Sequence, residues 1–210
     1  MKLAERAVAT LRSLAGEYPE ARCELDFHNP WQLLVATVLS AQCTDQRVNQ
    51  VTPEFFARWP TPSDLAGAAR ADVERVIRPT GFFRNKANGL QRTAHALVTE
   101  HDGSVPADIE QLVRLPGVGR KTAKVVLGEA FGIAAGVTVD THVRRVARRL
   151  GLTLQDDPEK IAGDLEKIIP QAEWTRFSMR MILHGRRVCT ARKPRCESCV
   201  LEGICPKVGV

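Results

Sequence analysis

Two residues in the middle of the chain have types suited to covalent chemistry. Lys121 lies just after a glycine-containing segment, residues 115–119, in the first turn of a predicted helix. A lysine amine in its neutral form is a nucleophile that can attack an electrophilic carbon and form a Schiff base. An exposed lysine with no chemical role is the commoner alternative. The position therefore indicates a candidate nucleophile.

Asp140 is the second candidate. It precedes a basic helical segment that ends near residues 150–151, so it is well placed as an N-cap, a role worth about 1 kcal/mol. A carboxylate held rigidly there can also stabilise an oxocarbenium-like transition state and help to deprotonate a lysine. Both roles can coexist because a carboxylate has two oxygens.

Four of the six cysteines crowd the end of the chain with the spacing C-x6-C-x2-C-x5-C: Cys189, Cys196, Cys199 and Cys205. Four thiolates in so short a span can bind zinc or an iron–sulfur cluster equally well, and ligand count leaves both open. Disulfides are disfavoured in an intracellular chain. Cys23 and Cys43 lie outside the pattern, and we expect them to be buried small hydrophobic residues.

The string Leu-Pro-Gly-Val-Gly at residues 115–119 lies between two helical patterns. Its two glycines permit a tight turn with no side chains in the way. Backbone N–H groups of the turn and of the following helix can then contact a phosphate without reading base sequence. A plain corner of a helical core is the alternative.

The elements that position these residues are predicted to be helices. Asn29 and Asp108 are candidate N-caps, Pro30 is suited to a first helical position, and a short helix is expected to start at residues 64–65. No run alternates apolar and polar residues for long enough to predict a strand. The pattern indicates an all-α protein.

Charge and hydropathy narrow the function class. Lysine and arginine outnumber aspartate and glutamate by 30 to 24, with arginines clustered at residues 144–149 and 186–195, which suits a polyanionic partner. Solvated helix faces are the alternative. No apolar run approaches the roughly 20 residues of a membrane span, and the first residues lack the apolar core of a signal peptide. We expect an intracellular protein without a membrane partner.

Residues 115–123, followed by Val-Asp-Thr-His-Val at 139–143, resemble the endonuclease III family of bifunctional DNA glycosylases. The resemblance implies that Lys121 is the attacking lysine and Asp140 the catalytic aspartate. It implies removal of oxidised pyrimidines and cleavage of the abasic site by β-elimination. Adenine-mispair glycosylases share the hairpin and the aspartate but usually lack this lysine, so Lys121 argues against that branch.

The resemblance also implies a cofactor and a set of DNA contacts. The cysteine spacing matches the family's [4Fe–4S] loop, which would present loop cations to phosphates. Gln42 matches the family's inserted glutamine. Phe82 takes the second wedge position, where many members carry leucine; a core position is its alternative. The full set of expected DNA-contacting residues is Gln42, Asp45, Phe82, Leu115, Gly117, Val118, Gly119, Arg120, His142 and Lys193.

The implied fold has two all-α domains with the active site in the cleft between them. Residues 23–134 form a six-helix barrel with the helix–hairpin–helix, and residues 1–22 and 135–210 form the iron–sulfur domain. The expected protein is a cytoplasmic monomer, associated with the bacterial nucleoid when it is engaged on double-stranded DNA with damaged bases or abasic sites. Two alternatives remain: a non-catalytic DNA-binding module and a monofunctional glycosylase.

Overall fold

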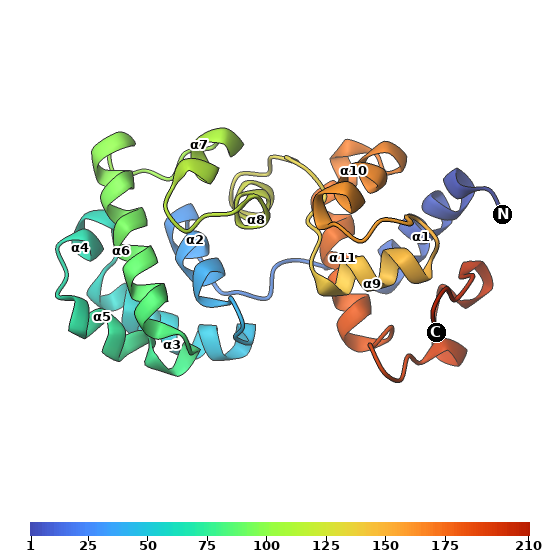
Figure 1. Cartoon of the computed structure of the whole chain (residues 1–210), viewed down its shortest axis with the longest axis horizontal. Helices are drawn as coiled ribbons and strands as arrows, with labels where there is room; N and C mark the ends of the chain where they lie inside the picture. The colour runs from blue at the N-terminus through green and yellow to red at the C-terminus, as the bar shows by residue number, and fades with distance from the viewer. The chain divides into compact units, whose positions relative to one another are not determined.

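A computed structural model describes all 210 residues, and its regular elements are all helices (Figure 1). The predicted all-α fold is confirmed. The chain divides into two compact units. We call residues 23–133 the central unit, and residues 1–22 with 134–210 the terminal unit. No helix is both long and apolar enough to cross a membrane.

The central unit consists of seven α-helices and one 3-10 turn: α2 (Pro30–Leu39), α3 (Asp45–Arg58), α4 (Pro62–Ala66), α5 (Arg70–Ile77), η1 (Arg78–Thr80), α6 (Phe83–Glu100), α7 (Ile109–Arg114) and α8 (Arg120–Ala130). Helix α2 is apolar on most of its surface and packs against α3, α6 and α8. Leu33, Leu34 and Leu39 of this helix are fully buried. Helix α2 therefore lies in the core of the unit, in contact with α3, α6 and α8.

Short-range capping explains where several of these helices begin. The side chains of Asn29 and Asp108 each accept a hydrogen bond from the backbone three residues on, at 2.9 Å, so both predicted N-caps are confirmed. The predicted start of a helix at Asp64 is wrong. Helix α4 begins at Pro62 because Thr61 is its N-cap, and the Asp64 carboxylate accepts the Thr61 backbone N–H at 3.0 Å.

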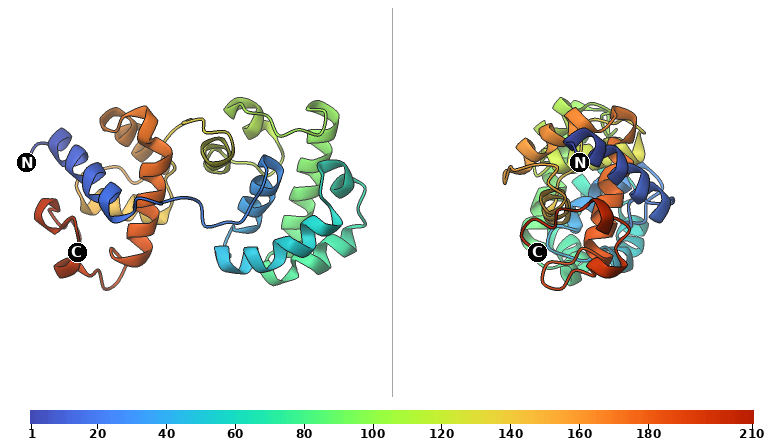
Figure 2. Two further views of the ribbon diagram at one scale, coloured as in Figure 1. Left: turned by 180° about the vertical axis from the view of Figure 1, so that it is seen from behind. Right: turned by 90° about the vertical axis from the view of Figure 1, so that its right-hand side faces the viewer.

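The terminal unit brings both ends of the chain together (Figure 2). It contains α1 (Leu3–Glu17), α9 (Thr141–Arg149), α10 (Pro158–Ile168), η2 (Gln171–Glu173), α11 (Trp174–Arg187), η3 (Cys196–Ser198) and η4 (Glu202–Ile204). Helices α1 and α9 both pack on α11. Gly185 of α11 permits a close approach to α9, because a Cβ there would lie 2.8 Å from the Cβ of His142. This approach places the cysteine segment, which follows α11, beside α9.

Candidate active site and cluster site

The hairpin between α7 and α8 is a tight turn anchored by its apolar side chains. Leu115 and Val118 are buried, and the Val118 N–H donates to the Leu115 carbonyl at 3.1 Å. Thr93 of α6 donates its hydroxyl to the Pro116 carbonyl at 2.6 Å. Gly117 has a φ of +82°, in the left-handed region that favours glycine. The anchors hold the turn with its glycines exposed.

The first turn of α8 is open to a ligand. Gly119 precedes the helix with a φ of −90° and has no side chain to cap it. A Cβ there would meet no atom within 4 Å, so the glycine matters because it leaves the helix start uncapped and uncovered. An uncapped helix start leaves backbone N–H groups without partners. Lys121 is exposed in this turn and makes no hydrogen bond or ion pair within the chain. Lys124 of the same helix is buried, with only 8% of its surface exposed.

Asp140 is the N-cap of α9, as predicted. Its Oδ1 accepts the backbone N–H groups of His142 and Val143, both at 2.8 Å, while Oδ2 makes no hydrogen bond within the chain. The preceding backbone is also fixed. The Val137 N–H donates to the Glu166 carboxylate at 2.8 Å, and the Thr138 N–H donates to the Ser178 hydroxyl at 2.9 Å. One carboxylate oxygen therefore holds the helix and the other is available for chemistry.

A chain of hydrogen bonds runs from the Asp140 cap to the cysteine segment. The His142 Nδ1 lies 3.1 Å from Arg145 Nη2, and Arg145 Nε donates to the Cys189 carbonyl at 2.9 Å. Because arginine can only donate, Nδ1 accepts and the imidazole is neutral. Burial lowers the pKa of His142, while the Asp140 carboxylate raises it. The sequence gives no sign of this role for Arg145, because its partner lies on another element.

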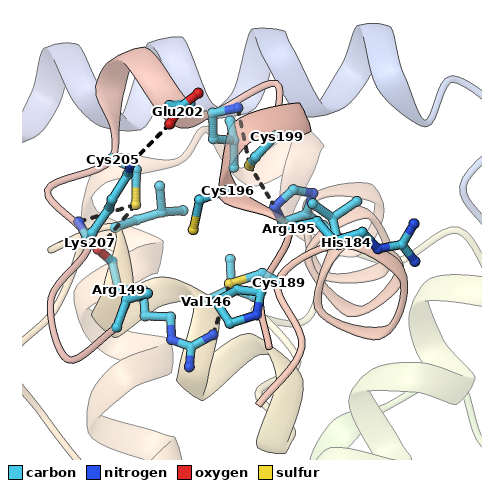
Figure 3. Close-up of a pocket in the computed structure, with 15 residues that line it drawn as sticks. Val146, Arg149, His184, Cys189, Arg195, Cys196, Cys199, Glu202, Cys205 and Lys207 are labelled. Atoms are coloured by element: carbon cyan, nitrogen blue, oxygen red, sulfur yellow. Dashed lines mark hydrogen bonds and ion pairs between the residues drawn. The ribbon is translucent and has the colours of Figure 1, made fainter. Parts of the chain in front are cut away.

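The four clustered cysteines line one cavity, together with His184 and Arg149 (Figure 3). Figure 3 shows their sulfur atoms on the inner side of the ring of labelled residues. No cysteine is in a disulfide, and no three of these side chains are arranged to bind one metal ion directly. A single Zn²⁺ takes its thiolates at about 2.3 Å. The donor set fits a multi-iron cluster, which is held by four thiolates around a larger volume.

Other groups of the terminal unit orient these sulfurs. Arg149, only 8% exposed, donates to the carbonyls of Thr190 and Ala191 at 2.7 and 2.9 Å, and its Nη1 lies 3.4 Å from the Cys189 sulfur. The buried His184 has Nε2 3.5 Å from the Cys199 sulfur, and burial lowers its pKa to about 4. N–H donors near cluster sulfurs are the outer-shell contacts that tune such a site. Two arginines of the 144–149 cluster, Arg145 and Arg149, therefore bind the backbone of this loop.

Two loops of the central unit carry the expected DNA-inserting residues. Gln42 and Phe82 both have left-handed backbone conformations, with φ of 54° and 48°. Phe82 is 63% exposed, so a core position for it is wrong. Asp45 is half-buried in the first turn of α3.

Of the remaining predicted DNA-contacting residues, Arg120 and Lys193 are exposed and His142 is half-buried. Lys193 lies in the cysteine loop, and Arg120 lies 3.4 Å from the Glu110 carboxylate.

The expectation that Cys23 and Cys43 are buried is wrong. Both are only half-buried, because each lies in a connection beside a helix and not on a core-facing helical position.

Comparison with known proteins first identifies the protein superfamily. Residues 35–171 match the HhH-GPD superfamily of base excision DNA repair proteins, and residues 189–205 match the iron–sulfur binding domain of endonuclease III. Endonuclease III of Synechocystis sp. is 55% identical over 202 residues, covering 96% of this chain and 92% of the relative. That of Escherichia coli is 39% identical over 195 residues, covering 93% and 92%.

A solved structure described as a trapped endonuclease III–DNA covalent intermediate superimposes with a TM-score of 0.93 at 43% identity, over 99% of this chain and 97% of that one. The chain therefore belongs to the endonuclease III family. It is a DNA glycosylase with AP lyase activity, which removes oxidised pyrimidines and cleaves the abasic site by β-elimination. Its cofactor is a [4Fe–4S] cluster.

Proposed function

We propose that Lys121 is the nucleophile of this reaction and that Asp140 is its carboxylate partner. One observation carries the proposal: the Lys121 side chain is exposed without a partner, whereas the Asp140 side chain is held in place. Oδ1 of Asp140 accepts two backbone hydrogen bonds, and Oδ2 stays available. A nucleophile needs an accessible amine, and an electrostatic catalyst needs a preorganised charge.

In the proposed reaction the neutral Lys121 amine attacks C1′ of the sugar, and the base leaves with the electron pair of the glycosidic bond. The Asp140 carboxylate stabilises the positive charge that develops on the sugar. The attacking nitrogen loses one proton, which neutralises the departing base. Ring oxygen O4′ then takes a proton from solvent and leaves C1′, which opens the ring and gives a protonated Schiff base on Lys121. Loss of a C2′ proton then expels the 3′ phosphate, and water hydrolyses the Schiff base to release the lysine.

The partner that we propose is double-stranded DNA with a damaged base or an abasic site. Four features support it: the uncapped start of α8 with Gly117, Val118, Gly119 and Arg120, the exposed Phe82, the exposed Gln42, and the exposed cation of Lys193. Leu115 would support the turn from inside, and Asp45 and His142 would line the pocket. We further propose that the protein works as a monomer in the cytoplasm, on the nucleoid when engaged.

The metal in this proposal is structural. Cys189, Cys196, Cys199 and Cys205 would hold the cluster, and the cluster would fix the loop that carries Lys193. A folded loop presents its cations to phosphates at lower entropic cost than a mobile one. No step of base removal is assigned to the metal.

Borohydride trapping tests the assignment. Native protein incubated with a duplex that contains an oxidised pyrimidine should form a covalent adduct, and Lys121→Ala should form none. Native protein that gives no adduct, or a Lys121→Ala variant that traps equally well, would contradict it. Base release without strand cleavage would support a monofunctional enzyme, and duplex binding without either reaction would support a binding module. Light scattering of the protein alone and on DNA tests the monomer.

A further inference from the structure

Lys86 is a buried cation to which the function described so far gives no role. It lies in the first turn of α6, and its side chain and backbone together are only 6% exposed. Its Nζ donates to the Leu39 carbonyl and to the Thr80 carbonyl, both at 2.8 Å. A buried lysine costs desolvation free energy, which its hydrogen bonds must offset. Two backbone acceptors from distant parts of the chain therefore converge on one ammonium group.

The two acceptors end the elements that lead into the two inserting loops. Leu39 is the last residue of α2, three residues before Gln42, and Thr80 is the last residue of η1, two residues before Phe82. Carbonyls at helix ends lack partners within the helix and attract cations. Lys86 also fixes the second loop through its backbone, because its N–H donates to the Phe82 carbonyl at 3.1 Å.

Both loops hold their exposed residue in an unfavourable backbone conformation. Gln42 and Phe82 are two of only four non-glycine residues with positive φ in the chain. A left-handed conformation costs a non-glycine residue roughly 1 kcal/mol or more and persists where the surroundings fix it. The Lys86 ammonium is the one side-chain group that bonds the backbone at the entry to both loops.

We propose that Lys86 is a positioning residue that sets the spacing of the Gln42 loop and the Phe82 loop, so that both can enter the duplex together. The inference rests on the proposed function of these two loops. Its consequence is selective: Lys86 matters where a base must be displaced from a paired duplex, and does not matter for the chemistry of Lys121 on a sugar that is already accessible. Burial lowers the pKa of Lys86, and the neighbouring Cys43 opposes this effect.

The test compares two substrates on the holoenzyme with Lys86→Met, which keeps the length of the side chain and removes its donors. Excision of an oxidised pyrimidine from duplex DNA should slow by roughly 10- to 100-fold, the cost of misplaced contacts. Borohydride trapping on a single-stranded abasic oligonucleotide should be unchanged. Fluorescence of 2-aminopurine placed opposite an abasic analogue, which reports displacement of the orphaned base, should rise less than with native protein.

The matched control is Lys124→Met, which removes a second buried lysine of the same unit, 8% exposed. It should change both substrates to the same degree. If Lys124→Met shows the same selective loss, or if Lys86→Met slows both substrates equally while its melting temperature is normal, the positioning role is refuted.

Lys86→Gln, which keeps one donor group, should fold where Lys86→Met does not and should show a smaller selective loss. In a Gln42→Ala, Phe82→Ala background, Lys86→Gln should add no further selective loss, because the side chains that the loops insert have already been removed. An additive loss would overturn the proposal. If the loop double variant itself behaves as native, the proposed function of the loops fails and takes this inference with it. If only the Lys86 variants behave as native, the inference alone fails.

Discussion

Helices α8 and α9 begin in opposite ways. Helix α8 follows Gly119, which offers no side chain to its backbone N–H groups, and Lys121 in its first turn has no partner. Helix α9 follows Asp140, which binds two of those groups with one oxygen. An open helix start is available to an external anion, and a capped one fixes its own charge. The contrast teaches that the start of α8 is left open to a ligand, whereas the start of α9 fixes its own carboxylate.

Removal of the Lys121 side chain, which has no partner in the chain, should have the largest effect on strand cleavage. Lys121→Ala should slow strand cleavage at an abasic site on the order of 10³-fold or more, because it removes the proposed nucleophile. Its free energy of unfolding should change by less than about 0.5 kcal/mol, since an exposed side chain without partners is lost. Single-turnover cleavage and urea unfolding measure the two effects. Lys160→Ala, at an exposed position on α10, is the control. Equal rates of cleavage by the two variants would contradict the proposed role of Lys121.

Two substitutions of Asp140, the cap of α9, should separate its effect on the cleavage rate from its effect on the free energy of unfolding. Asp140→Asn keeps a cap oxygen but loses the charge, so cleavage should fall on the order of 10²- to 10³-fold while stability stays near native. Asp140→Ala should lose the same activity and about 1 kcal/mol of unfolding free energy as well.

Asp157 provides the control for this pair, because it caps α10 of the same unit through the backbone N–H groups of Glu159 and Lys160, at 3.1 and 3.0 Å. Asp157→Ala should lose the cap energy and keep the activity. A native rate for Asp140→Asn would show that Asp140 is only a cap.

The end of α9 holds the cysteine loop, and this contact should have the next largest effect. Arg149→Met leaves the carbonyls of Thr190 and Ala191 without their donor, which should cost about 2 kcal/mol or more. The visible absorbance and iron content per chain should fall with it. Exposed Arg148→Met, whose partner is the exposed Asp156, should change stability by less than about 0.5 kcal/mol. Full iron content in Arg149→Met would show that the loop holds its cluster without this contact.

Local rules made part of this molecule predictable from the sequence. The caps Asn29, Asp108 and Asp140 each act on a backbone group within three residues, so their roles follow from the adjacent sequence. The four cysteines of residues 189–205 likewise lie in one short segment, so a metal site could be predicted there, while the choice of an iron–sulfur cluster came from the family resemblance. The sequence pattern predicts a helix start at Asp64, two residues too late, because Thr61 is an equally good cap and lies just before Pro62.

The contacts that sequence could not reveal join distant segments. Arg145, Arg149 and Lys86 have the appearance of ordinary surface cations in the sequence, and their partners are carbonyls on other elements. Backbone acceptors are present at every residue, so no residue type marks them. The left-handed conformation of Phe82 was likewise hidden, because it is imposed by surrounding structure on a residue that rarely adopts it.

The smallest expected effect concerns His142, which joins the capped start of α9 to its other contacts. Its pKa in the folded protein is below 6.5 mainly because of burial; Asp140 raises it, and Arg145 and Arg186 lower it. Below pH 6.5 the unfolded chain therefore binds more protons at this site than the folded one, so the unfolding free energy falls as the pH drops from 6.5 towards the folded pKa. His142→Gln should flatten that decline, while the separate contribution of His184 stays in both proteins. NMR titration of the ring should place the His142 pKa below 6.5, and Asp140→Asn should lower it further. A His142 pKa at or above 6.5 would contradict this account, because burial and the neighbouring Arg145 both oppose protonation of the ring.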